Sequence, residues 1–185
     1  MFVDEAYIKK HFCSQALLDK DGSNRAQKSA PEQKESTKAF NKIALLIKYR
    51  DRSVYEIRKR LSESQFSEPA IEEAIERACR CGYLDDGRFA ESYTRSKILA
   101  GKGLHGIIKD LNRHEIDPFA LEGFPYSCLP KDYDAIESAL VLLNRKPPRA
   151  KNQKQAAYAK LIREGYTSTQ AVEAVNLWVS ATLSK

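Results

Sequence analysis

The sequence predicts an all-α protein of tandem three-helix repeats that stack into an elongated, curved array. Of 185 residues only 8 are Gly and 7 are Pro, whereas the helix formers Ala, Leu, Glu, Lys and Arg are abundant. No segment alternates apolar and polar residues as a half-buried strand does. Similar residue types also recur every fifty positions, which is typical of a duplicated unit. The matched sets are Leu61, Leu111 and Leu161; Phe66, Ile116 and Tyr166; and the helix-capping types Ser67, Asp117 and Thr167.

The first part of the chain, residues 1–38, is predicted to be an extension and linker. A short helix is expected over residues 5–18, followed by a polar stretch rich in turn-forming residues. Ser29 and Glu32 have the spacing of a capping box, and Pro31 suits a first helical turn. The first helix of the first repeat is therefore expected to begin near residue 31.

Three repeats are expected over residues 39–82, 83–130 with a trailing loop, and 131–185. Capping boxes are predicted at Ser53 with Glu56 and at Thr167 with Gln170, and Gly165 suits a helix end. Pro147 and Pro148 are expected to separate two helices, and Trp178 falls in a core stripe with Val175 and Val179. The expected helices span residues 31–50, 54–63 and 68–80; 86–100, 104–114 and 118–122; and 131–144, 149–164 and 168–183.

The charge of the chain favours a polyanionic partner. Its net charge is +6, and residues 131–185 are the most basic segment, with nine Lys and Arg against five Asp and Glu. Two clusters are candidates for contact with phosphates or an acidic protein surface, and a solvated helix face is the alternative for each. The first holds Lys48, Arg50, Arg52, Arg58, Lys59 and Arg60; the second holds Arg145, Lys146, Arg149, Lys151 and Lys154, where acids are sparse; Lys102 and Lys109 lie between them.

Catalytic and metal-binding interpretations are weaker than structural ones. Asp85 and Asp86 form a carboxylate pair, but no further carboxylates or histidines recur at a useful spacing, so opening a helix is the better interpretation. The three histidines are scattered, no phosphate-binding loop motif is present, and the four cysteines lack zinc-finger spacing. The first residues lack the basic and then apolar run of a signal peptide, and no apolar run is long enough to span a bilayer. We expect a cytoplasmic, monomeric protein without cofactor or metal.

One stretch, from Gly82 to Asp117, carries a specific resemblance. It combines an acidic pair, a Phe-Ala step and a glycine break between helices in a fixed order. In this arrangement it resembles the middle repeat of the RecX family, small bacterial proteins that regulate the RecA recombinase, and the resemblance extends from about residue 39 to the C-terminus. The residues that carry it are Gly82, Tyr83, Leu84, Asp85, Asp86, Phe89, Ala90, Gly103, Ile107 and Leu111.

The resemblance implies a binding function without catalysis. RecX-like proteins lie in the groove of the recombinase–DNA filament, bridge its protomers, and inhibit ATP hydrolysis and strand exchange. The implied partners are a RecA-type filament and, through weak and salt-sensitive contacts, single- or double-stranded DNA. The alternative is a helix-turn-helix-like regulator of specific DNA sites, for which Ser168, Thr169 and Gln170 are candidate base-reading residues.

Overall fold

The computed structural model describes residues 30–183, which contain helices and turns but no strand. The predicted all-α class is therefore confirmed. The described part of the chain divides into two compact units, with the boundary between Asp85 and Asp86. The helix expected over residues 5–18 and the cap at Ser29 lie outside the described residues.

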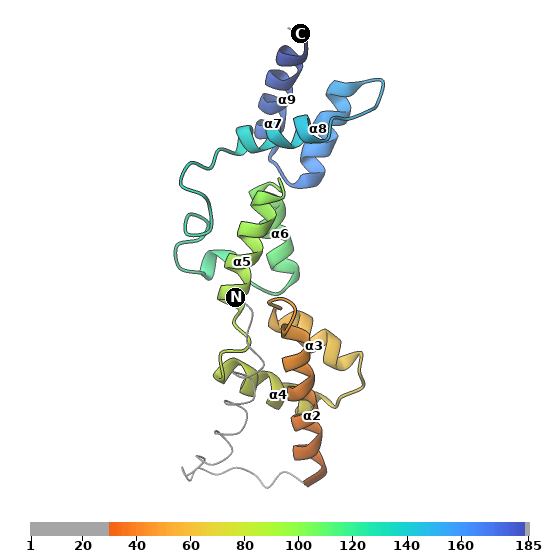
Figure 1. The fold of residues 1–185 in the computed structure, drawn as a ribbon, viewed down its shortest axis with the longest axis vertical. Helices are drawn as coiled ribbons and strands as arrows, with labels where there is room; N and C mark the ends of the chain where they lie inside the picture. The colour runs from red at the N-terminus through yellow and green to blue at the C-terminus, as the bar shows by residue number, and fades with distance from the viewer. Residues whose placement is uncertain (1–29, 184–185) are drawn as a thin grey trace. The chain divides into compact units, whose positions relative to one another are not determined.

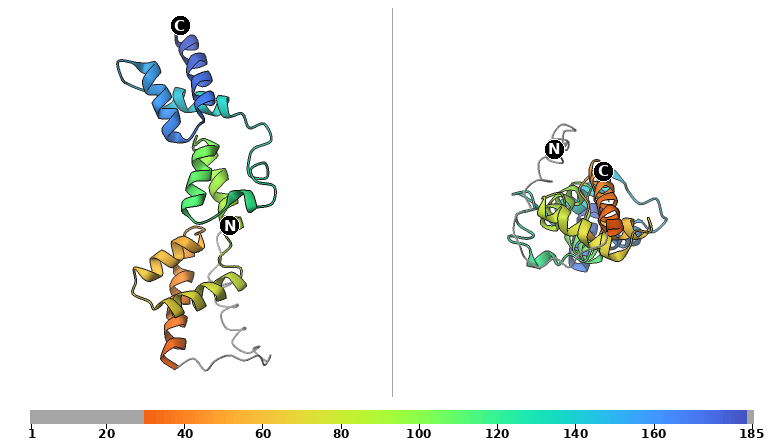
Figure 2. Two further views of the ribbon diagram at one scale, coloured as in Figure 1. Left: turned by 180° about the vertical axis from the view of Figure 1, so that it is seen from behind. Right: turned by 90° about the horizontal axis from the view of Figure 1, so that it is seen from below.

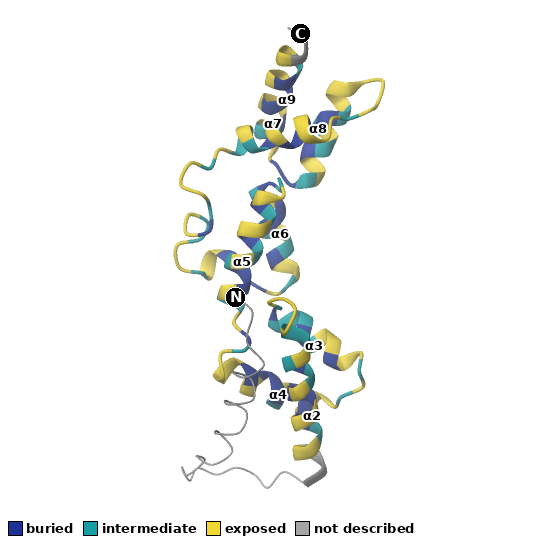
Figure 3. Cartoon of the chain, in the orientation of Figure 1, coloured by how far each residue is buried: buried dark blue, intermediate teal, exposed yellow. Residues whose placement is uncertain are grey.

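The first unit is a three-helix assembly of α2 (Ala30–Ile47), α3 (Val54–Ser62) and α4 (Glu68–Arg80). Helix α4 packs on both α2 and α3, as Figure 1 shows. The apolar faces of the three helices point at one another, so the buried residues form a continuous interior (Figure 3). This core contains Ala39, Phe40, Ile43, Ile57, Leu61, Ile71, Ala74, Ile75, Ala78 and Leu84.

The helix ends of this unit are set by specific polar contacts. Helix α2 ends at Ile47, three residues before the predicted end, and the Arg52 Nε donates to the Leu46 carbonyl of its last turn at 3.0 Å. Ser53 caps α3 as predicted, because its hydroxyl accepts from the Glu56 amide at 3.2 Å. Ser67 is the N-cap residue of α4, as its residue type predicts, but its side chain forms no hydrogen bond to the first turn of that helix. Its hydroxyl and amide both donate to the Glu35 carboxylate at 2.8 Å, which ties α4 to α2.

The second unit contains α5 (Asp86–Leu99), α6 (Leu104–Arg113), the short 3-10 turn η2 (Pro118–Ala120), α7 (Ala135–Arg145), α8 (Gln153–Glu164) and α9 (Ser168–Leu183). Helices α5 and α6 share one core, and α7 and α8 both pack on α9 over another (Figure 2). Residues 121–134 run between these parts as a loop, anchored by half-buried apolar side chains. The predicted core position of Trp178 is confirmed, since it is buried in the core that α7, α8 and α9 share and donates Nε1–H to the Asn144 Oδ1 at 3.1 Å.

Three predicted helices of this unit differ from the observed ones by two or more residues at one end, and local backbone geometry or a capping side chain explains each difference. The third helix of the middle repeat is a single 3-10 turn, Pro118–Ala120, because the backbone is extended at Leu121. Helix α7 begins at Ala135 rather than 131, since the Asp134 carboxylate accepts from two amides of its first turn, at 2.6 and 3.0 Å. Helix α8 begins at Gln153 rather than 149, where Asn152 provides the cap. The break at the two prolines is confirmed, because α7 ends at Arg145.

The fifty-residue period has a structural origin in three equivalent helix ends. The residue before each aromatic or isoleucine of the period has a positive φ: 62° at Gln65, 60° at Glu115 and 89° at Gly165. The next amide then reaches back five residues to a buried leucine carbonyl, at 3.4, 3.1 and 3.0 Å respectively. This is the Schellman arrangement, which closes a helix and directs the following residue inward. Leu61, Leu111 and Leu161 are accordingly fully buried.

Within the second unit, the start of α6 lies directly against the turn between α8 and α9. The Gly103 amide donates to the Glu164 carbonyl at 2.9 Å, and the Gly106 amide to the Gly165 carbonyl at 3.1 Å. A Cβ added to Gly103 would lie 2.4 Å from the Gly165 oxygen, and one added to Gly165 would lie 2.3 Å from the Gly106 Cα. Only glycine permits this backbone approach. We refer to the contact of Gly103, Gly106 and Gly165 as the glycine joint.

Candidate functional site

The apolar motif residues of segment 82–111 belong to two buried cores: Leu84 to that of the first unit, and Phe89, Ala90, Ile107 and Leu111 to that of α5 and α6. Asp86 begins α5, and Phe89 and Ala90 are buried one turn later. The Phe89 ring stacks on Tyr93 with centroids 5.5 Å apart and lies 5.3 Å from the ring of His114. Leu111 is fully buried in the same core, and Gly103 is the N-cap of α6 and part of the glycine joint. In this structure the acidic Asp85–Asp86 pair therefore stands at a helix start, where negative charge is stabilised by the helix dipole.

The first basic cluster is largely paired with glutamates. Arg50 lies 2.9 Å and Arg52 3.5 Å from the Glu56 carboxylate. Burial is the main cause that lowers the pKa of the Arg52 guanidinium, and the positive charge of Arg50 lowers it further. Arg58 pairs with both Glu68 and Glu72, and Arg60 lies 3.4 Å from Glu63. Lys48 and Lys59 are exposed, and within the described chain their side chains form neither a hydrogen bond nor an ion pair.

The second basic cluster is different because no acid balances it. Residues 138–163 contain seven Lys and Arg and no Asp or Glu. Arg145 donates to the Ala100 carbonyl at 3.0 Å, close to the glycine joint. The other four members are exposed, and their side chains form no hydrogen bond or ion pair with any described residue: Lys146, Arg149, Lys151 and Lys154. This segment therefore presents concentrated positive charge to solvent.

Lys160 belongs to the same basic region but was missed in the sequence. Its ammonium is half-buried and donates to the carbonyls of Lys146 and, at 3.5 Å, Leu142. Burial lowers the pKa of Lys160, and the nearby charges of Lys146, Arg145 and Arg163 lower it further against the effect of Glu164. The lysine thus fixes the end of α7, from which the basic loop begins. Its position at the α8–α7 contact was not evident from its residue type.

Lys102 and Lys109, the candidates between the clusters, have different environments. Lys102 pairs with the Asp110 carboxylate, which also accepts from the Tyr93 hydroxyl at 2.8 Å and lies 3.1 Å from Arg113. Burial alone would raise the pKa of Asp110, but the hydrogen bonds from Lys102 and Tyr93 outweigh it and lower the pKa. Lys109 is exposed on α6 and has no ionic partner among residues 30–183. Of the two, only Lys109 is available to a binding partner without breaking an internal pair.

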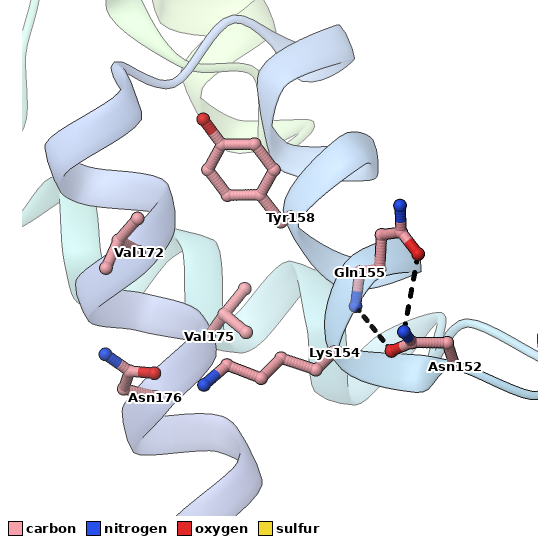
Figure 4. Close-up of a pocket in the computed structure, with 7 residues that line it drawn as sticks. All are labelled: Asn152, Lys154, Gln155, Tyr158, Val172, Val175 and Asn176. Carbon is pink, nitrogen blue, oxygen red and sulfur yellow. Dashed lines mark hydrogen bonds between the residues drawn. The ribbon is translucent and has the colours of Figure 1, made fainter.

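A pocket of about 400 Å³ lies between α8 and α9, beside the second basic cluster (Figure 4). The Val172 and Val175 side chains and the Tyr158 ring form its apolar surface. Lys154 extends from α8 toward Val175 and Asn176 on α9, as Figure 4 shows. The lining residues are Asn152, Lys154, Gln155, Tyr158, Val172, Val175 and Asn176, none of which is acidic. Sequence reasoning identified only Lys154 here, because the pocket depends on how α8 crosses α9.

The residues considered for base reading belong to a helix cap. The Thr167 hydroxyl accepts from the Gln170 amide at 3.3 Å, and the Thr167 amide donates to the Gln170 Oε1 at 3.0 Å. The predicted capping box is therefore confirmed, and it occupies Gln170. Ser168 and Thr169 are exposed in the first turn of α9.

Over the described chain, no group of three or more His, Cys, Asp and Glu side chains is arranged to hold a metal ion. No helix within residues 30–183 is both long and apolar enough to cross a bilayer. Cys79 and Cys81 are exposed at the end of α4, and Cys128 is buried in the loop between η2 and α7.

Comparisons of family models, sequences and structures all find proteins named RecX. The family model for "RecX, first three-helix domain" matches residues 39–77. The chain is 30% identical over 129 residues to the regulatory protein RecX of Vibrio parahaemolyticus serotype O3:K6, covering 68% of this chain and 81% of that protein. It is 28% identical over 145 residues to the regulatory protein RecX of Haemophilus influenzae strain PittEE, covering 76% and 94%.

Two crystal structures share the fold. One is RecX from Lactobacillus salivarius, with a TM-score of 0.60 at 21% identity, covering 79% of this chain and 97% of that one. The other is described as regulatory protein RecX, with a TM-score of 0.66 at 20% identity, covering 94% and 87%.

Proposed function

The chain belongs to the RecX family of regulatory proteins, and from that premise we propose that it binds a RecA-type recombinase filament on DNA and inhibits its ATP hydrolysis and strand exchange. The observation that carries the proposal is the relationship itself, 30% identity over 129 residues to a regulatory protein RecX. The action is one of binding, in which the chain occupies a surface that the recombinase needs.

The charge distribution supports a filament as the partner. A recombinase filament on DNA offers phosphates, and neutralising phosphates with lysine and arginine releases bound counterions. The exposed cations of residues 138–163 are suited to this because no acid within that segment competes for them. Most arginines of the first cluster would have to leave a glutamate first, which costs part of the gain. We therefore propose that the second cluster makes the principal electrostatic contact, through Lys146, Arg149, Lys151 and Lys154.

The direct test is the DNA-dependent ATPase of the cognate recombinase on single-stranded DNA, with and without this protein. Equimolar or lower amounts are expected to slow hydrolysis, and strand exchange is expected to fall in parallel. Unchanged hydrolysis together with selective binding of one duplex sequence would instead establish the DNA-binding regulator. The occupied side chain of Gln170 argues against that alternative.

A charge-reversal comparison locates the contact. Reversing Lys146, Arg149 and Lys151 to Glu is expected to weaken filament binding by about tenfold or more at moderate salt, since each lost phosphate contact reduces affinity and its salt dependence. Arg145 is left intact because its guanidinium donates to the Ala100 carbonyl. Far-UV circular dichroism should be unchanged, as exposed charges contribute roughly 0–1 kcal/mol each to stability.

The matched control makes the same change in net charge elsewhere. Lys34, Lys38 and Lys131 are exposed and lie outside both clusters, so their reversal to Glu lowers the total charge equally. If both triple variants bind the filament equally well, the second cluster is a solvated face, and the contact moves to Lys48, Arg50, Arg52 and Arg58.

A further inference from the structure

The pocket between α8 and α9 exposes apolar surface that the core of the unit does not cover. Val172 lines it with 49% of its surface exposed, although Val175 one turn later is only 2% exposed. The Tyr158 ring is half-buried beside them. The aliphatic part of Lys154 lies along the same surface in Figure 4, and its ammonium ends near Asn176. The result is a small apolar depression bordered by one cation and three amide side chains.

The α8 side of this depression carries charge of one sign, whereas α9 has one exposed acid, Glu173, next to Val172. The loop that leads into α8 carries Arg149 and Lys151, and the acid-free segment continues through α8 to Arg163. No lining residue is acidic, and the Lys154 ammonium has no ionic partner among the described residues. An anionic ligand is therefore complemented at the rim, whereas the floor accepts only an apolar group.

We infer that this pocket receives an apolar side chain from an acidic polypeptide segment of the partner, with Lys154 and the neighbouring loop cations pairing with carboxylates on either side of it. The inference rests on the proposed function, which makes the recombinase the source of the segment. A side chain of valine or leucine size fits a depression of about 400 Å³ together with part of the backbone that carries it. Interface energy commonly concentrates at such an anchor in a pocket, surrounded by charged and polar contacts.

A nucleobase is the less suitable occupant. Single-stranded nucleic acid is usually held by stacking bases on exposed aromatic faces. Here the only aromatic lining residue is the half-buried Tyr158, and the exposed part of the floor is the aliphatic Val172. The Asn152 and Gln155 side chains are also engaged, because the Asn152 Nδ2 donates to the Gln155 Oε1 at 3.3 Å and the Asn152 Oδ1 accepts from the Gln155 backbone N–H at 3.1 Å.

The test compares two substitutions on one helix. Val172→Asp places a carboxylate in the pocket. Leu177→Asp is the matched control, because Leu177 lies on α9 with 50% of its surface exposed but does not line the pocket. The two positions are about 140° apart around the helix. Binding to the cognate recombinase filament and to free fluorescein-labelled oligothymidylate is measured for both, with helicity and Trp178 fluorescence as folding checks.

Val172→Asp is expected to weaken filament binding by about tenfold or more relative to Leu177→Asp, as for the loss of an anchor contact. The two variants should bind the oligonucleotide alike, since their net charges are equal. If Val172→Asp loses structure, the isosteric Val172→Thr replaces it, with a smaller loss expected in the same direction. Benzoylphenylalanine at position 172 should cross-link to a recombinase peptide that contains Asp or Glu near the modified residue.

Three outcomes overturn the inference. If the two variants bind the filament equally well and the wild-type protein also binds it, the pocket does not contact the recombinase, but the proposed function is unaffected. A loss specific to Val172 on the free oligonucleotide, or a cross-link to DNA, assigns the pocket to nucleic acid. Absence of filament binding by the wild-type protein removes the proposed function and this inference with it.

Discussion

The glycine joint offers a prediction in which two effects have opposite signs. Gly106 lies inside α6, where replacement by alanine favours the helix by about 1 kcal/mol on propensity alone. The tertiary contact opposes this, because the new Cβ would lie 2.9 Å from the Gly165 Cα and 3.1 Å from the Glu164 carbonyl oxygen. Ordinary carbon contacts lie at about 3.5–4.0 Å, so the α8–α9 turn must withdraw by roughly 0.6–1 Å.

This displacement is large enough to break the hydrogen bonds of the joint. The Gly103–Glu164 and Gly106–Gly165 bonds, at 2.9 and 3.1 Å, would lengthen past the useful limit of about 3.5 Å. The Gly103 amide would then be buried without its partner, at a cost of roughly 1–3 kcal/mol. The Gly106 amide keeps its second bond to the Gly103 carbonyl at 3.0 Å, so its loss is nearer 0.5–1.5 kcal/mol. After the helix gain is subtracted, Gly106→Ala should lower the free energy of unfolding by about 0.5–3.5 kcal/mol.

Urea unfolding followed by Trp178 fluorescence measures this change in the unit that contains the joint, because the chain has one tryptophan and it is buried on α9. Amide hydrogen exchange at residues 103 and 106 reports the two bonds directly and should accelerate in the variant. Gly103→Ala should be at least as destabilising, since its Cβ would lie only 2.4 Å from the Gly165 oxygen. An unchanged or increased stability of Gly106→Ala, with exchange still slow at residue 103, would refute the reasoning.

Three further substitutions have clear expected directions. Ser53→Ala removes a fully buried cap from α3 and should lower the free energy of unfolding by about 1 kcal/mol in urea titration monitored by circular dichroism; no change would mean that another group caps the helix. Glu115→Gly relieves a positive φ of 60° and should stabilise the chain by up to about 1 kcal/mol in the same titration; destabilisation would show that the side chain outweighs the strain. Asp110→Asn should cost about 1–3 kcal/mol at pH 7. The pKa of Asp110 is lowered in the fold, so its ionised carboxylate stabilises the protein at a pH above the unfolded-state pKa of about 3.9, and this stability is lost as the pH falls through the lower folded-state pKa. The free energy of unfolding of the variant should therefore depend less on pH between about 4 and 2. An unchanged pH dependence would contradict the pairing with Lys102.

The sequence by itself determined the helical class, most helix ends and the period. Local signals suffice for these, because a cap or a Schellman turn depends on a few neighbouring residues. Thus Ser53, Thr167 and Gly165 were assigned correctly, and the recurrence of Leu61, Leu111 and Leu161 marked three equivalent helix ends. The starts of α7 and α8 were placed four residues too early, since residues 131–134 and 149–152 contain no proline or glycine to exclude a helix, and the caps are Asp134 and Asn152.

The sequence showed that acids are sparse around the second cluster, but only the tertiary structure decided how far the first cluster is paired and where a pocket lies. Arg50, Arg52 and Arg58 form as dense a cluster in sequence as the residues after Arg145, but the fold brings glutamates of α3 and α4 onto the first cluster and none onto the second. The glycine joint and the depression at Val172 likewise join helices that are distant in the chain. Residue type and spacing specify the hydrogen bonds within a helix and at its ends. Contacts between helices depend instead on how all the buried side chains pack together, which cannot be derived from neighbouring residues alone.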